Sequence, residues 1–158
     1  MSKDTQKVID LLNKARAREL TAISQYMVQH YELDNADYGK LAKVLKKVAI
    51  VEMKHAERLA ERILFLGGKP TSKPDAEIKK GQPILQMLAT DEAIEMQAVA
   101  MYNEAAAACA EAGDRVSKDL FESLLADEDE HVDLFQSFQE HIKQMGNAYL
   151  ATLIGEGE

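Results

Sequence analysis

Six side chains in this 158-residue sequence are of the types that bind metal ions and stand at positions where they could act together. Two Glu-x-x-His motifs each place a carboxylate and an imidazole three residues apart, on one face of a helix. Carboxylate oxygens with one imidazole per ion suit iron or manganese better than metals that prefer thiolates. We therefore predict a dinuclear metal site made by six residues: Glu19, Glu52, His55, Glu95, Glu128 and His131.

The four glutamates repeat with a regular spacing. Glu19 and Glu52 are 33 residues apart, as are Glu95 and Glu128, and the second pair follows the first at an offset of 76. This pattern indicates a diverged duplication of one helical hairpin. Each glutamate lies about 16 residues, or about 25 Å along a helix, from the turn of its hairpin. All six side chains are therefore expected at one depth in the core.

Glycine and proline positions divide the chain into long segments. The segments are rich in Ala, Leu, Glu, Lys and Gln, which favour helices, and none has the two-residue alternation of a strand. We expect four helices, at about 4–34, 37–66, 83–112 and 114–145.

The ends of these helices have recognisable signals. Asp34 or Asp37 is expected to cap the second helix, with Gly39 in its first turn at a cost of about 1 kcal/mol. Pro83 suits the start of the third helix. Asp114, after a glycine, is expected to cap the fourth.

The connections predict the topology. Short turns join the first helix to the second and the third to the fourth, which makes two antiparallel hairpins. Residues 67–82 are long enough to run the length of the bundle. The fold class expected is all-α, a four-helix bundle with one long crossover. An apolar tail follows Gly146 and is too short to fold alone, so it should pack on the rest.

Each expected helix carries an apolar stripe at spacings of three and four, and every stripe contains a glutamate. A single Glu-x-x-His arises by chance in many helical proteins, and a glutamate near a helix end can reach solvent. Four bare carboxylates in mid-helix would not be tolerated, because burying one unpaired charge costs several kcal/mol. No lysine or arginine occupies the stripes at that depth, whereas two divalent cations would balance the charge.

Composition excludes several classes of function. Nineteen basic and 27 acidic residues give a net charge of −8, so nucleic acid and anionic membranes are not expected partners. One cysteine, Cys109, allows neither a disulfide framework nor a CxxC metal site. No apolar run approaches the ~18 residues of a membrane span, and the first residues lack the apolar core of a signal peptide. We expect one domain over 1–158 and a cytoplasmic location.

Four glutamates with two Glu-x-x-His motifs are typical of ferritin-like di-iron proteins. Nearly the whole chain resembles the bacterioferritins more closely still, through five stretches: Glu19–Tyr26, Glu52–Arg58, Arg62–Pro70, Glu128–His131, and the tail from Met145-Gly146 to Tyr149-Leu150. The resemblance implies that two Fe(II) ions bind, reduce dioxygen or peroxide together, and leave as Fe(III) for a mineral core. It implies terminal ligands at Glu19 and Glu95, and bridging ligands at Glu52 and Glu128. His55 would complete the coordination of one iron, and His131 that of the other.

Tyr26 lies seven residues beyond Glu19, on the same helix face. It either orients a ligand or supplies an electron, or it is an ordinary core tyrosine. For Tyr102, its counterpart at the offset of 76, the core assignment is favoured.

Met53 points about 100° away from the stripe that contains Glu52. It belongs to a second apolar stripe with Ala42, Ala49, Ile50, Ala56 and Ala60, and a matching stripe on the first helix contains Leu20, Ile23 and Met27. Spacing alone predicts that Met53 packs in a subunit interface. In bacterioferritins the methionine in this Glu-Met-x-His setting binds haem across a two-fold dimer, so the resemblance implies that Met53 is a haem ligand and that haem admits electrons.

The resemblance also implies an assembly. Bacterioferritins form hollow shells of twenty-four subunits built from two-fold dimers, with a short fifth helix that the tail at 146–154 fits. A small ferredoxin is the reductant that the family suggests. Lys47 and Val51 stand where some members carry a histidine and an aspartate on the inner surface, which argues against an accessory iron site there.

Two other functions fit the residues less well. One is a di-iron oxidase or peroxidase of rubrerythrin-like type that stores nothing, or a manganese enzyme of the same design. The lack of a second cysteine argues against a fused rubredoxin. The other is a metal-free interaction bundle, for which the second apolar stripe is the main support. The iron retained per chain distinguishes storage from the other two.

Overall fold

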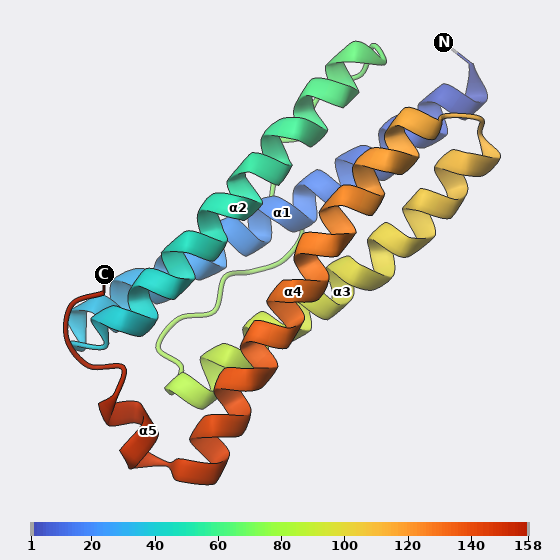
Figure 1. Cartoon of the computed structure of the whole chain (residues 1–158). Helices are drawn as coiled ribbons and strands as arrows, with labels where there is room; N and C mark the ends of the chain where they lie inside the picture. Colours follow the sequence, from blue (N-terminus) through green and yellow to red (C-terminus); the bar gives the residue numbers. More distant parts are fainter. Residues whose placement is uncertain (1, 158) are drawn as a thin grey trace.

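A computed structural model describes residues 2–157, which contain helices and no strand. The described helices are α1 (Lys3–Asn35), α2 (Gly39–Phe65), α3 (Ile84–Glu111), α4 (Arg115–Met145) and α5 (Asn147–Ala151). The four long helices match the four segments predicted from glycine and proline positions, and they form the predicted bundle (Figure 1). The all-α fold class is confirmed, and it includes the short C-terminal helix.

The bundle consists of two antiparallel hairpins, α1 with α2 and α3 with α4, and α1 also contacts α3. Buried apolar side chains form two separate clusters along its length. The first is centred on Tyr26, Leu45 and Phe135, and the second on Leu12, Tyr102 and Phe121. Every long helix contributes to both, and the predicted metal-binding residues lie in the sequence between the two contributions.

The crossover from α2 to α3 runs beside α1 and in the same direction (Figure 1). Polar side chains on one stripe of α1 hold it by bonds to its backbone. Gln25 donates to the carbonyl of Lys79 and accepts from its N–H, both at 2.8 Å. The other contacts of this kind join Asn13 to Lys69 and Thr71, Thr21 to Asp75, and Glu32 to Gly81. These bonds satisfy a backbone that has no secondary structure of its own.

The predicted cap of α2 is wrong. The residue before α2 is Tyr38, no side chain caps the helix, and Asp37 instead has a positive φ of 69° in the turn. Gly39 is explained by the C-terminal segment, because a Cβ there would collide with the carbonyl oxygen of Gly155. The predicted cap of α4 is confirmed, since the carboxylate of Asp114 accepts from the Ser117 N–H at 2.9 Å.

The C-terminal segment folds back on the bundle. Gly146 (φ 56°) makes the turn out of α4, and α5 follows with Tyr149 and Leu150 against the first apolar cluster. Leu153 is buried, and the Lys40 N–H donates to its carbonyl at 3.2 Å. The tail therefore packs beside the turn between α1 and α2, where Figure 1 places the C-terminus.

No helix within residues 2–157 is both long and apolar enough to cross a membrane.

Candidate metal centre

All six predicted metal-binding side chains lie together in the middle of the bundle. Each of the four long helices contributes one glutamate, and α2 and α4 add one histidine each. The glutamates are at most 1% exposed and the histidines at most 9%. Because the glutamates stand near the middle of helices of similar length, hairpin packing brings them to one depth, as the spacing predicted.

The six residues form two overlapping groups that share two glutamates. One contains Glu19, Glu52, His55 and Glu128, and the other contains Glu52, Glu95, Glu128 and His131. In each group every residue offers one ligand atom, and these atoms all lie within 4.8 Å of one another. Two adjacent cations could therefore each contact one histidine and one unshared glutamate, with Glu52 and Glu128 between them.

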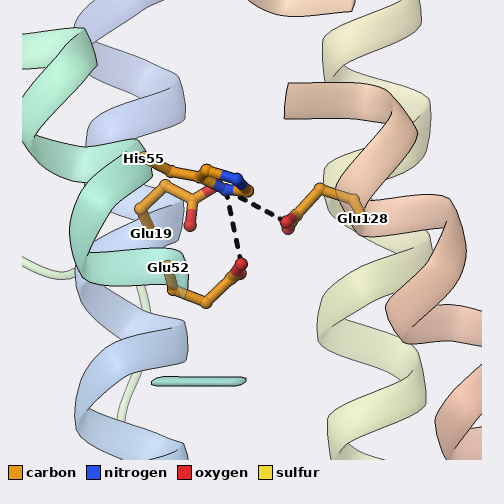
Figure 2. A group of neighbouring side chains, drawn as sticks. All are labelled: Glu19, Glu52, His55 and Glu128. Atoms are coloured by element: carbon orange, nitrogen blue, oxygen red, sulfur yellow. Dashed lines mark ion pairs between the residues drawn. The ribbon is translucent and has the colours of Figure 1, made fainter. Parts of the chain in front are cut away.

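The first group converges on Nδ1 of His55 (Figure 2). This nitrogen lies 3.4 Å from Glu19 Oε1, 3.3 Å from Glu52 Oε1 and 3.2 Å from Glu128 Oε1. The second group converges on His131 in nearly the same way, with Nδ1 at 3.4 Å from Glu52 Oε1, 3.4 Å from Glu95 Oε1 and 3.5 Å from Glu128 Oε1. The two halves of the centre therefore follow the internal repeat of the sequence.

Most side-chain oxygen and nitrogen atoms of these six residues have no hydrogen-bond partner in the described structure. They are both oxygens of Glu52, Oε1 of Glu128, Oε2 of Glu19 and of Glu95, and Nδ1 of both histidines. Buried polar atoms are almost always partnered, so a cluster of orphaned oxygens and imidazole nitrogens needs an explanation. Divalent cations would satisfy all of them, and the donor set of hard oxygens with two imidazoles fits iron or manganese.

A buried tyrosine holds each unshared glutamate. The Tyr26 hydroxyl donates to Glu95 Oε1 at 2.7 Å, and the Tyr102 hydroxyl donates to Glu19 Oε1. Tyr26 therefore serves the glutamate of the other hairpin rather than Glu19 on its own helix. The core assignment of Tyr102 missed this bond, which the match of Tyr102 to Tyr26 at the offset of 76 could have suggested.

The protonation of the metal-free centre follows from burial and crowding. Burial and neighbouring carboxylates raise the pKa of Glu19, Glu52 and Glu95. Burial alone would lower the pKa of His55 and His131, but the surrounding glutamates raise both to about 10. Burial also opposes ionisation of Glu128, yet contacts from both histidines lower its pKa. Without metal the centre holds protons in place of cations.

Asp127 is a neighbour of the centre that the sequence analysis missed. Its Oδ2 lies 2.8 Å from Nε2 of His55, the ring nitrogen that faces away from the glutamates. The sequence contained a signal for this contact. Asp127 directly precedes Glu128, and a residue beside a core position of one helix can reach the facing helix of the bundle.

Met53 lies on the outer surface of α2 and is 53% exposed. Ile50, on the same helix, is 38% exposed. Three alanines of the predicted second stripe, Ala42, Ala49 and Ala56, are instead buried within the chain. The outward stripe is therefore narrower than expected, because the alanines allow close packing inside the bundle.

Comparison with protein families places the chain among ferritin-like proteins. The sequence model of a family described as "Ferritin-like domain" matches residues 9–145. The bacterioferritin of Desulfovibrio desulfuricans is 44% identical over 149 residues, which are 94% of this chain and 83% of that protein. The bacterioferritin of Rhodobacter capsulatus is 44% identical over 137 residues, 85% of this chain and 84% of that protein.

Solved structures agree with the sequences. The bacterioferritin of D. desulfuricans, described with its diiron site in different catalytic states, superposes with a TM-score of 0.95 at 43% identity. It covers 98% of this chain, and the chain covers 90% of it. That of R. capsulatus, described with a metal-free dinuclear site and a heme iron in a crystallographic special position, gives a TM-score of 0.90 at 40% identity, covering 95% and 94%.

Proposed function

The chain belongs to the bacterioferritin family of ferritin-like proteins, and from that premise we propose how it handles iron. It binds Fe(II), oxidises it to Fe(III) with dioxygen or peroxide, and deposits it as a mineral inside a hollow shell of twenty-four subunits. The observation that carries the proposal is the buried set of six oxygen and nitrogen ligands with orphaned atoms facing one another. Iron is the substrate here, and the protein is a ferroxidase as well as a store.

The contacts divide the ligands into two kinds. Oε1 of Glu52 and Oε1 of Glu128 each approach both histidines, so these two glutamates would bridge the irons. Glu19 approaches only His55 and Glu95 approaches only His131, so each would be a terminal ligand of one iron.

A bridged pair of Fe(II) ions supplies two electrons to one oxidant, which limits the release of radicals. The remaining chemistry belongs to the chain. Tyr26 holds Glu95 through its hydroxyl and Tyr102 holds Glu19, so both terminal carboxylates keep one orientation. The apolar clusters on either side exclude water from the centre. The tyrosine hydroxyl also places Tyr26 in contact with a ligand, where it could supply an electron.

Haem binding is the second part of the proposal. Met53 is exposed on α2, where a second copy of the chain related by a two-fold axis could place its own methionine opposite. The R. capsulatus bacterioferritin structure has a heme iron in a crystallographic special position, which fits a group shared between two symmetric subunits. Electrons from a small ferredoxin would enter through this haem and release stored iron by reduction.

The same premise suggests the organisation of the whole protein. We propose that residues 1–158 make one ferritin-like domain, with the tail at 146–154 as the fifth helix, and that the shell works in the cytoplasm. Limited proteolysis would test the first statement, and cell fractionation would test the second.

The experiment that tests the function measures iron retained per chain after aerobic loading with excess Fe(II), followed by gel filtration. Storage predicts many irons per chain, eluting with a very large particle. A plateau near two irons per chain would indicate a rubrerythrin-like di-iron oxidase instead.

A variant distinguishes these two iron-binding functions from that of a metal-free bundle. Glu52→Ala removes a ligand that approaches both histidines, so iron oxidation and retention should be lost. Glu57→Ala, an exposed glutamate on the same helix, is the matched control and should load like the wild type. Unchanged iron oxidation in Glu52→Ala would contradict the proposed centre.

A further inference from the structure

The two halves of the metal centre differ in what holds the histidine. Nε2 of His55 lies 2.8 Å from Oδ2 of Asp127, while Nδ1 of the same ring faces the glutamates. Among residues 2–157, no side chain makes a hydrogen bond to Nε2 of His131, although its Nδ1 faces the glutamates in the same way. The difference lies outside the set of ligands.

A carboxylate at the outer nitrogen changes what the imidazole can do. It accepts the Nε2–H, so the other nitrogen carries the lone pair, and it fixes the plane of the ring. It also makes the ring a stronger electron donor to a metal. Loss of such a partner typically costs 10-fold to 100-fold in metal affinity.

The internal repeat shows that this difference is built into the sequence. At the offset of 76, Asp127 corresponds to Val51, whose side chain accepts no hydrogen bond. The ligands themselves match across the repeat, glutamate to glutamate and histidine to histidine. A rotation of one side chain could not remove the difference, because position 51 has no acceptor to offer.

The solvent exposure of the two histidines also differs between the two halves of the centre. The His55 side chain is 2% exposed and that of His131 is 11% exposed. The side chain of Asp127 is 45% exposed, so it keeps water on one side and meets His55 on the other. Its charge is therefore held beside the ring without being buried.

Asp91 is another polar residue without a polar counterpart, since the repeat places Ala15 at the matching position. It is fully buried four residues before Glu95, and neither carboxyl oxygen has a partner. Burial raises its pKa well above the usual value, so a negative charge beside the His131 half is disfavoured there. It does not offset the effect of Asp127.

We propose that Asp127 is a positioning residue that makes the His55 half the tighter of two divalent-cation sites. The His131 half, with Val51 in the equivalent position, is the weaker site and exchanges its ion more readily. The inference rests on the proposed function, since it requires that both halves bind metal.

The test uses the assembled, metal-free protein and Co(II), with no oxidant present. Visible absorption and calorimetry follow the titration, so binding is read without any turnover. The wild type should bind two ions per chain in two steps, the first tighter. Asp127→Ala should weaken the first step by about 10-fold to 100-fold, so that the steps merge. Asp127→Asn keeps an acceptor for Nε2–H and should restore part of the loss.

A gain-of-function variant gives an independent arm. Val51→Asp supplies a carboxylate at the position that the repeat matches to Asp127, and it should tighten the second step by a similar factor while leaving the first unchanged. Asp129→Ala, an exposed aspartate two residues beyond Asp127, is the matched control and should titrate like the wild type. Circular dichroism of each variant checks that the bundle is intact.

The possible outcomes distinguish a failure of the proposed function from a failure of the proposed asymmetry. A wild type that binds no Co(II) would overturn the proposed function itself. Two ions bound in indistinguishable steps would overturn the asymmetry. If the two steps are distinct but neither Asp127→Ala nor Val51→Asp changes them, the assignment to Asp127 is wrong. The same holds if both variants weaken the two steps equally. In either case the proposed function still stands.

Discussion

At the scale of residues, the glutamates and histidines of the metal-free centre shift one another's pKa values. Three glutamates have raised pKa values because they are buried and close to one another. The pKa of Glu128 is lowered instead, since both histidines approach its Oε1. The cluster therefore holds protons on both histidines, and its buried glutamates ionise less readily than exposed ones, until cations replace the protons.

Metal binding should release protons. At pH 7 His55 and His131 each carry a proton on Nδ1 that a cation must displace, because their pKa values are about 10. We expect at least two protons per chain, with more from the glutamates, when Zn(II) fills both sites. A titration in weak buffer with a pH electrode measures this. Filling of both sites with no release of protons would contradict the protonation described here.

The metal-free protein should lose stability as the pH rises. The folded-state pKa of each histidine, about 10, exceeds its ordinary 6.5, so its contribution is complete below pH 6.5 and disappears as the pH passes through 10. The raised pKa values of Glu19, Glu52 and Glu95 act in the same direction above pH 4.5, since ionising them in the core costs free energy. Scanning calorimetry should give a Tm that falls steadily from pH 6.5 to 10.

A variant tests the cause of that slope. Glu52→Gln cannot ionise, so at pH 8 the metal-free variant should be more stable than the wild type by about 1–3 kcal/mol, the usual cost of an unsatisfied buried group. At pH 5 the two proteins should be nearly equal. A gain of the same size at both values would mean that packing, rather than ionisation, is responsible.

At the scale of elements, the crossover between the hairpins is held along α1, the helix that carries Glu19. The crossover is fixed to α1 at several points along its length, which sets how the second hairpin lies on the first. Sequence patterns predicted the helices and the length of this segment. The polar stripe of α1 that binds it was not predicted, because spaced polar residues on a helix ordinarily face solvent.

Gly39 links the start of α2 to the C-terminal tail. Gly39→Ala should cost about 1–3 kcal/mol, because the added Cβ meets the backbone at Gly155 and one of the two segments must move. Chemical denaturation measures the cost, and hydrogen exchange should rise at the Gly155 N–H, which donates to Asp37 O at 3.0 Å. Lys46→Ala, at an exposed position of the same helix, is the control. Unchanged exchange at Gly155 would show that the contact is not needed to hold the tail.

At the scale of the whole molecule, several apolar side chains of α2, among them Ile50, Met53 and Leu64, are exposed on the single chain. We expect Met53→Leu to lose haem absorption while it retains the same iron per chain and the same particle size. Met96→Leu, at a methionine of α3 that is 51% exposed, is the matched control and should keep its haem. Retention of haem by Met53→Leu, in the same amount as in the control, would contradict the assigned ligand.

Sequence patterns alone predicted the helices, their pairing into hairpins, the common depth of the six candidate metal-binding side chains and the family of the chain. Those features depend on periodicity and spacing along one chain, which residue types report directly. Tertiary structure decided that Tyr26 serves Glu95, that Asp127 holds His55, and that Gly39 admits the tail. These contacts cross between elements, and each requires two atoms to meet within a few ångströms. Only the rotation and packing of whole helices against one another set distances on that scale.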